Sequence, residues 1–144
     1  FLSEDRTRTF FHGHSFTANP LACAVACASL DLMEESRSLD KVRALEGWLR
    51  RGLEPLRHLP LVGEVRVIGG VGIVELVTDK TTRASGGYLD TLGPRLTAAF
   101  LEHGLLLRPL GNIVYFMPPY VITEAETVSA LRTIADVLED ASQR

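Results

Sequence analysis

Apolar residues recur at helical spacing in four stretches of this 144-residue chain. The predicted helices span residues 19–35, about 38–56, about 90–103 and 123 to about 141. Asn19 and Pro20 mark the start of the first, because asparagine caps helices and proline fits the first helical position. Thr123 and Glu126 have the spacing of a capping box and mark the start of the last.

Short runs of branched residues predict four β-strands, at 62–68, 72–77, 105–108 and 113–117. Gly69-Gly70 predicts a turn between the first two, and not a nucleotide loop, because a strand follows and the third glycine of a GxGxxG motif is missing. The polar residues 79–88 predict an irregular loop. This order of elements predicts an α+β fold with helices packed on a mainly antiparallel sheet.

The predicted helix at 19–35 is apolar nearly all round, which indicates a buried helix. Cys23 and Cys27 lie on one face of it and have neither CxxC spacing nor further ligands, so we expect buried thiols. The helix at 38–56 is amphipathic. Its apolar face holds Leu39, Val42, Leu45, Leu49 and Leu53.

Composition limits the class of protein. A length of 144 residues allows one sizeable core, and 46% hydrophobic residues with a mean hydropathy of +0.12 indicate a compact globular chain. A net charge of −3 with scattered charges favours neither nucleic acid nor a membrane surface as partner. No transmembrane or signal pattern is present, so the cytoplasm is the expected location. The chain opens without methionine, which is consistent with a fragment.

Residues 12–22, HGHSFTANPLA, place hydroxyls and backbone N–H groups just before a helix start. Such a loop suits an anion such as phosphate, although the local pattern alone is more often a simple helix cap. His12 and His14 could be imagined as metal ligands. Without a third ligand at a usual spacing, they make a weak case for a metal site.

The same run resembles the HG-x-[ST]-[FY]-x-G-N-P-L-A signature of the class III, fold type I, pyridoxal-phosphate aminotransferases. Residues 107–120, LRPLGNIVYFMPPY, are similar to the branch of that class that acts in biotin synthesis. Residues 65–76 resemble the paired strands that open the family's C-terminal domain. The resemblance implies that residues 1–35 end the cofactor-binding large domain and that residues 36–144 form the C-terminal small domain.

The resemblance also implies a cofactor contact. In the family, the hydroxyl residue matching Ser15 binds the phosphate of the pyridoxal phosphate held by the other subunit of a homodimer. Serine replaces the commoner threonine there, and His14 is expected beside it as a second contact. Ala18 replaces the commoner glycine, so the loop is strained if this position has a positive φ.

Arg108 is the expected substrate contact. An arginine at the end of an apolar strand is more often a surface residue, but in the family the matching arginine receives the substrate carboxylate. A planar guanidinium suits that task because it pairs with both oxygens. Tyr115 is expected in the same substrate site. Tyr115 and Tyr120 could equally be packing aromatics with a hydrogen-bonding tip.

Complete enzymes of the implied branch transfer the amino group of S-adenosylmethionine to 8-amino-7-oxononanoate and yield 7,8-diaminononanoate. The reaction needs a lysine that forms a Schiff base with the cofactor. Neither Lys41 nor Lys80 follows a strand in the family's lysine motif, so we expect no catalytic residue here and no activity from this chain alone. The alternatives are an ornithine-type or γ-aminobutyrate-type ω-aminotransferase of the same class, or a non-catalytic dimerising domain.

Overall fold

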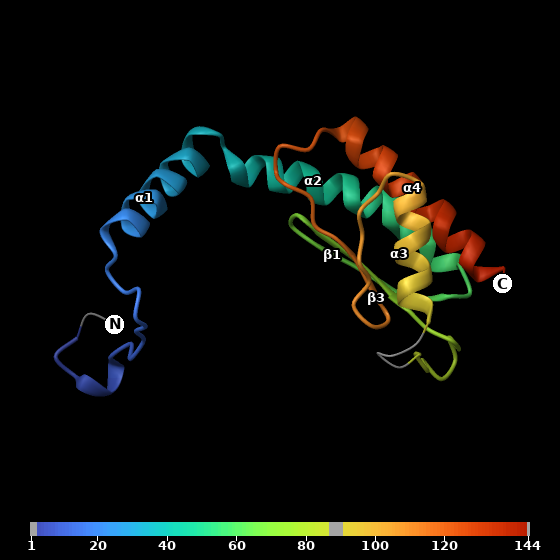
Figure 1. The fold of residues 1–144 in the computed structure, drawn as a ribbon, viewed down its shortest axis with the longest axis horizontal. Coiled ribbons are helices and arrows are strands. Elements are labelled where there is room, and N and C mark those ends of the chain that lie inside the picture. The colour runs from blue at the N-terminus through green and yellow to red at the C-terminus, as the bar shows by residue number, and fades with distance from the viewer. Residues whose placement is uncertain (1–2, 87–90, 144) are drawn as a thin grey trace. The chain divides into compact units, whose positions relative to one another are not determined.

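The structure, a computed structural model, describes residues 3–86 and 91–143. The chain has two compact units, Phe1–Arg37 and Ser38–Arg144. In the first unit, the 3-10 helix η1 (Arg6–Arg8) precedes an extended loop and the helix α1 (Pro20–Glu35) (Figure 1). Asn19 caps α1 as predicted, since its side chain accepts a hydrogen bond of 3.1 Å from the Ala22 N–H.

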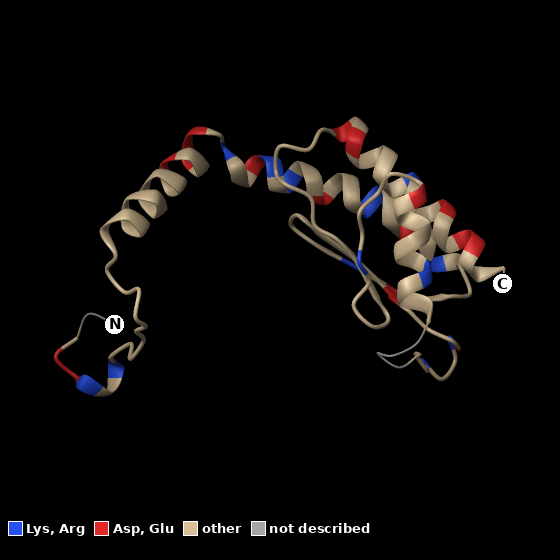
Figure 2. Ribbon diagram, in the orientation of Figure 1, with Lys and Arg blue, Asp and Glu red and all other residues tan. Residues whose placement is uncertain are grey.

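The prediction that α1 is buried is wrong for this chain. None of its residues is buried, and Leu21 is 78% exposed. Cys23 and Cys27 are likewise exposed, not buried thiols. Figure 2 shows that charged residues on α1 lie only toward its C-terminal end. The other described residues of the first unit form a short helical turn and loops, which are too small to build a core around an apolar helix.

The second unit holds the predicted α+β fold. Its elements are α2 (Ser38–Leu53), η2 (Glu54–His58), β1 (Val62–Ile68), β2 (Val71–Leu76), α3 (Leu92–Glu102), β3 (Ile113–Phe116) and α4 (Glu124–Ser142). The strands form an antiparallel sheet in the order β1-β2-β3. Gly69 turns the chain between β1 and β2 with a φ of +52°, which confirms the predicted turn.

The core lies between the helices and one face of the sheet (Figure 1). On that face Val65, Val74 and Val114 are cross-strand neighbours and are buried. Leu45, Leu49 and Leu53 of α2, Phe100 of α3, and Leu131 and Ile134 of α4 are buried against them. Leu39 is 66% exposed, although the pattern placed it on the same helix face. It lies one turn before Val42, which already reaches the β1–β2 turn, so Leu39 extends past the sheet.

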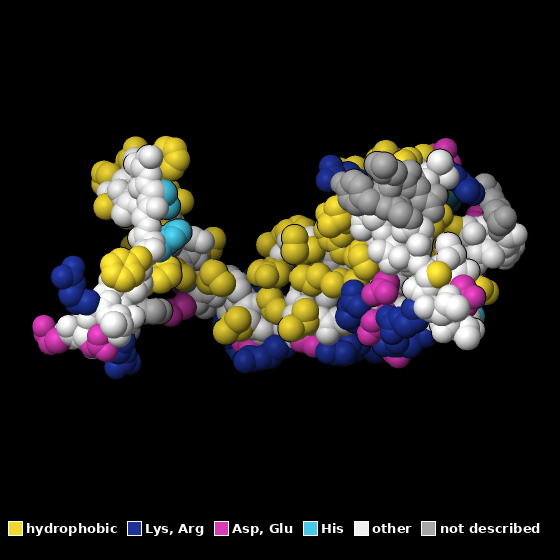
Figure 3. Space-filling view, turned by 90° about the horizontal axis from the view of Figure 1, so that it is seen from below, with side chains coloured by type: hydrophobic (Ala, Val, Ile, Leu, Met, Phe, Trp, Pro, Cys, Tyr) yellow, Lys and Arg dark blue, Asp and Glu magenta, His cyan; other side chains and the backbone are white. Residues whose placement is uncertain are grey.

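The other face of the sheet carries an ion cluster, made of Glu64, Arg66, Glu75 and Arg83. Arg66 donates to Glu64 at 2.9 Å and to Glu75 at 2.8 Å, and Arg83 donates to Glu64 at 3.1 Å. The bond from Arg83 lowers the pKa of Glu64, and the bond to Glu75 raises the pKa of Arg66. Exposed hydrophobic side chains also gather on the second unit as viewed in Figure 3. Ile68 and Met117 are among the exposed hydrophobic residues of this unit.

The predicted strand at 105–108 is wrong. These residues are irregular, because the ladder bonds of β2 go to β1 and β3 and because Pro109 has no N–H to donate. Only Leu110 bridges to Ile113 there. Residues 87–90, including the predicted helix start at Asp90, lie outside the described residues. Gly104 has a φ of +75°, which confirms the left-handed end of α3.

The capping box of α4 is also confirmed. The Thr123 hydroxyl accepts a hydrogen bond from the Glu126 N–H at 3.2 Å, and the Glu126 carboxylate accepts one from the Thr123 N–H at 2.8 Å. The bond from the Thr123 N–H, and a second one of 2.7 Å that the Thr123 hydroxyl donates to the same carboxylate, lower the pKa of Glu126. Ala18 has a φ of +59°, so the strain that the sequence made conditional is present at this position.

Gly52→Ala should destabilise the second unit. A Cβ at Gly52 would collide with Cδ1 of buried Leu131 and lie 3.2 Å from its Cβ and Cγ, so α2 and α4 must separate. We expect the free energy of unfolding in urea to fall by about 1–3 kcal/mol. Gly47→Ala on the same helix is the control, because its Cβ would meet only Arg51, at 3.5 Å. This substitution should raise the free energy of unfolding by about 0.5–1 kcal/mol. Equal effects of both substitutions would contradict the packing described.

Ala18→Gly should relax the loop before α1. A left-handed alanine costs about 1–2 kcal/mol, and the added freedom of glycine in the unfolded chain offsets about 0.5–1 kcal/mol of the relief. The amides of Thr17 and Asn19, bonded to His14 and Phe16, should therefore exchange hydrogen several-fold more slowly. Ala24→Gly, inside α1, should only weaken the helix. Unchanged or faster exchange in Ala18→Gly would show that the loop is unstrained.

Candidate functional site

The loop before α1 is built from two successive turns. The Thr17 N–H donates to the His14 carbonyl at 3.0 Å, and the Asn19 N–H donates to the Phe16 carbonyl at 3.2 Å. The His14 N–H donates to the Thr17 hydroxyl at 2.9 Å, so this side chain closes the first turn. The Ser15 hydroxyl takes part in none of these bonds and is exposed, as are the other residues of this loop.

Ser15 and His14 present unpaired donors. Within residues 3–86 and 91–143, nothing hydrogen-bonds to the Ser15 side chain, and both residues are exposed. Nδ1 of His14 accepts a bond of 3.1 Å from the Phe16 N–H, which places the ring proton of the neutral form on Nε2. One O–H and one N–H therefore remain for an anion.

The N-terminal end of α1 offers fewer free N–H groups to an anion than the sequence pattern indicated. Pro20 has no N–H, and the Ala22 N–H is already taken by Asn19. An anion here would be bound mainly by loop donors. The rings of Phe10, His12, His14 and Phe16 follow one another at centroid distances of 5.4, 5.9 and 6.0 Å, a series that alternate aromatic positions in the sequence could have indicated.

Arg108 lies on the second unit, beside a groove of about 570 Å³. The groove is lined by Gly93, Pro94, Thr97, Ala98 and Leu101 of α3 and by residues 108–111. Arg108 is exposed, and its guanidinium makes no ion pair or hydrogen bond with any described residue. An unpaired planar cation beside a mainly apolar groove can receive the carboxylate of an aliphatic acid.

Tyr115 does not line this groove. It lies on β3 opposite Ile73, on the sheet face that carries the ion cluster, and is 38% exposed. Tyr120 lies against the β1–β2 turn, where its Cε1 is 2.8 Å from the place a Cβ of Gly70 would occupy. Tyr120 thus packs on the turn with part of its ring, although it is 47% exposed.

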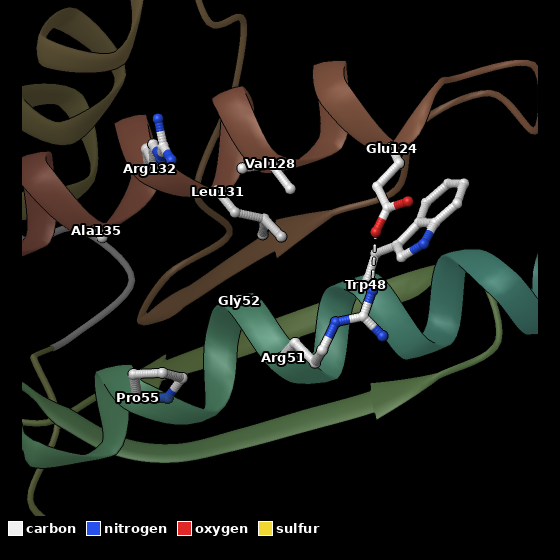
Figure 4. Close-up of a pocket in the computed structure, with 9 residues that line it drawn as sticks. All are labelled: Trp48, Arg51, Gly52, Pro55, Glu124, Val128, Leu131, Arg132 and Ala135. Carbon is white, nitrogen blue, oxygen red and sulfur yellow. Dashed lines mark hydrogen bonds and ion pairs between the residues drawn. The ribbon is translucent and has the colours of Figure 1, made fainter.

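A second groove, of about 370 Å³, lies between α2 and α4 (Figure 4). Arg51 reaches across it from α2 and donates to Glu124 of α4 at 2.9 Å, beside Trp48. None of the residues predicted from the sequence to bind a ligand lines this groove. Of its two arginines, Arg51 and Arg132, Arg51 is paired with Glu124, and that carboxylate also lines the groove and disfavours a bound anion.

The described side chains and helices also limit the kind of site. Among the described residues, no three side chains of histidine, cysteine, aspartate or glutamate are grouped so that they could hold a metal ion. No helix in the same part of the chain combines the length and apolar character needed to cross a bilayer.

Comparison with known proteins covers nearly the whole chain. The profile of the class III aminotransferases matches residues 3–138. The adenosylmethionine-8-amino-7-oxononanoate aminotransferase of Synechococcus elongatus is 45% identical over 140 residues, which are 97% of this chain and 31% of that protein. The chain thus spans about a third of the length of this relative.

Solved structures agree in fold. The crystal structure of the enzyme of the same name from Methanocaldococcus jannaschii matches with a TM-score of 0.80 and 31% identity, over 92% of this chain and 30% of that one. A thermostable omega transaminase mutant from Pseudomonas jessenii matches with a TM-score of 0.80 and 34% identity, over 94% of this chain and 30% of that one. The chain belongs to the class III aminotransferase family.

Proposed function

We propose that this chain is the C-terminal part of a pyridoxal-phosphate aminotransferase that transfers the amino group of S-adenosylmethionine to 8-amino-7-oxononanoate, giving 7,8-diaminononanoate. The observation that carries the proposal is the unpaired guanidinium of Arg108 beside an apolar groove. This arrangement suits a long-chain acid with a carboxylate at one end. The names of the similar proteins from Synechococcus and Methanocaldococcus support this choice of substrates.

The cofactor fits the donors of the first unit. The free Ser15 hydroxyl and the Nε2–H of His14 could bind two phosphate oxygens of pyridoxal phosphate. As in other members of the family, we propose that this contact reaches the cofactor of the other subunit in a homodimer. When bound, the cofactor supplies the electron sink that amino transfer requires.

Arg108 would bind and orient the acceptor. Its guanidinium pairs with the carboxylate and so fixes the distance from this end of the substrate to its keto carbon. Pro94, Ala98 and Leu101 offer apolar surface to the aliphatic chain. Tyr115 is proposed as a second substrate contact outside this groove, through its phenolic hydroxyl. Binding at the carboxylate, away from the reacting carbon, selects the acid over shorter or uncharged ketones.

The 144 residues on their own are proposed to be inactive. Lys41 is exposed on α2, and Nζ of Lys80 donates to the Arg57 carbonyl at 2.7 Å. Neither lysine lines the groove beside Arg108. Both belong to the second unit, whereas Ser15 belongs to the first. The lysine that binds the cofactor would come from the rest of a longer polypeptide, consistent with the third of the Synechococcus protein that this chain covers.

A second candidate function is another class III ω-aminotransferase. The omega transaminase from Pseudomonas jessenii matches as well in fold as the Methanocaldococcus enzyme, with a TM-score of 0.80 for each. The two functions differ in amino donor and acceptor. They can be distinguished in a chimeric enzyme, made from the Synechococcus relative by exchanging its 140 matched residues for those of this chain. Use of S-adenosylmethionine with 8-amino-7-oxononanoate supports the proposal; use of other amines and ketones only would favour the second candidate.

Arg108→Ala in the chimeric enzyme should lower kcat/KM for 8-amino-7-oxononanoate by well over tenfold. Where the bound substrate shields this charged pair from water, truncating one member of it costs about 2–5 kcal/mol. Arg108→Lys should rescue the loss only in part, because an ammonium cannot pair with both oxygens. The methyl ester of the same keto acid is the control. Its kcat/KM should be the same in both variants as in the unsubstituted chimeric enzyme. If kcat/KM for the acid does not change, Arg108 is a surface residue and the proposed carboxylate site is wrong.

Ser15→Ala should have the opposite effect. Loss of one neutral donor to the phosphate costs about 1 kcal/mol, so the Kd of pyridoxal phosphate should rise several-fold, as measured by cofactor absorbance. At saturating cofactor, kcat/KM for the keto acid should change little. Ser15→Thr keeps the hydroxyl and should bind the cofactor normally. An unchanged Kd in Ser15→Ala would remove Ser15 from the phosphate site.

A further inference from the structure

Two hydrogen bonds, one through the backbone and one through the side chain, join Asn112 to Leu76 at the end of β2. The Leu76 N–H donates to the Asn112 carbonyl at 2.7 Å, and the Asn112 side-chain N–H donates to the Leu76 carbonyl at 3.0 Å. Leu76 is buried, with 1% of its surface exposed, so these two groups lie where lost hydrogen bonds are costly. Together with the pairing of Ile113 and Glu75, Asn112 therefore fastens the turn after Arg108 to the central strand.

The chain around Arg108 has few other restraints. Residues 105–108 belong to no strand, and no described residue hydrogen-bonds to the Arg108 backbone. Before it, the side chain of Leu107 is buried at 9% exposure. After it, Pro109 confines Arg108 to extended backbone conformations. The position of Arg108 then depends on two anchors, Leu107 on one side and the turn on the other.

The turn of residues 110–113 is closed by its own backbone hydrogen bonds. Leu110 and Ile113 exchange backbone hydrogen bonds of 2.8 and 3.1 Å, and Gly111 between them has a φ of +59°. These bonds hold the turn to itself, and its last residue, Ile113, pairs with Glu75 of β2. Without the Asn112 amide, the backbone bond from the Leu76 N–H remains, so the turn keeps its shape but residue 112 is held to Leu76 by one hydrogen bond instead of two and can shift slightly.

From these contacts we infer that Asn112 is a positioning residue for Arg108, which sets where the guanidinium meets the substrate carboxylate. The inference rests on the proposed function. A displacement of the guanidinium by a fraction of an ångström to an ångström costs carboxylate pairing, because the fork and the carboxylate must align. A substrate without a charged carboxylate does not use the fork, so Asn112 affects it little.

Two variants of the chimeric enzyme test this role. Asn112→Ala removes the amide, and the near-isosteric Asn112→Asp replaces the donor with an acceptor facing the Leu76 carbonyl. Each should lower kcat/KM for 8-amino-7-oxononanoate about tenfold or more, mainly through KM. For the methyl ester of this acid, kcat/KM should fall by less than about twofold. Should Asn112→Ala fail to fold, Asn112→Asp supplies the same comparison.

Thr78→Val is the matched control. The Thr78 hydroxyl also donates from a side chain to a backbone carbonyl, that of Ala84 at 3.1 Å, just after the same strand but away from Arg108. It should lower kcat/KM for acid and ester alike, or for neither. If the Asn112 variants resemble Thr78→Val in this comparison, Asn112 has a structural role only and the inference is overturned.

A double-mutant cycle separates this inference from the proposed function. Adding Asn112→Ala to Arg108→Ala should cause no further loss of preference for the acid over the ester. Additive losses would show that the two residues act independently, which overturns the inference but leaves the carboxylate site intact. If Arg108→Ala alone leaves the preference unchanged, the proposed function itself fails.

Discussion

The central strand β2 is the element on which the second unit depends. Its backbone is paired with β1 on one edge and β3 on the other, and Asn112 completes the pairing at its end. Its alternate residues Val74 and Leu76 pack under the helices, whereas Glu75 faces outward into the ion cluster. Because a one-residue shift would reverse both faces, the register is fixed by burial. The turn that follows Arg108 inherits its position from this register.

The chain thus offers two different kinds of ligand contact. The loop of the first unit has neutral donors, a hydroxyl and an imidazole N–H, on a short and exposed segment. The groove of the second unit has one full charge on a segment tied to a packed sheet. Neutral donors suit a phosphate shared among many groups, and a fixed charged fork suits a single carboxylate. The proposed aminotransferase uses one contact for the cofactor and the other for the substrate.

Local hydrogen bonds were the most predictable features. Asn19, Thr123 and Gly104 were identified from sequence because caps depend on residues within one turn. The strand at 105–108 was wrong because its apolar pattern says nothing about whether a partner edge is free. The burial of α1 was wrong because periodicity shows that a helix needs covering, not that this chain provides the cover.

In the candidate site, too, the residues carried by a local motif were predictable and the residue that depends on a distant contact was not. Ser15 and Arg108 were found through motifs, and their lack of partners among the described residues is compatible with ligand binding. Asn112 lies in the same motif, yet its role was missed because its contact Leu76 is 36 residues away in the chain. No local pattern reports such a contact. Only the sheet register brings the two residues together.

A crystal structure of the chimeric enzyme with 8-amino-7-oxononanoate bound tests the central claim most directly. Two guanidinium nitrogens of Arg108 are expected about 2.7–2.9 Å from the two oxygens of the substrate carboxylate. The amide of Asn112 is expected to remain bonded to the Leu76 carbonyl. A carboxylate bound by other residues, with Arg108 in solvent, would contradict the proposed site.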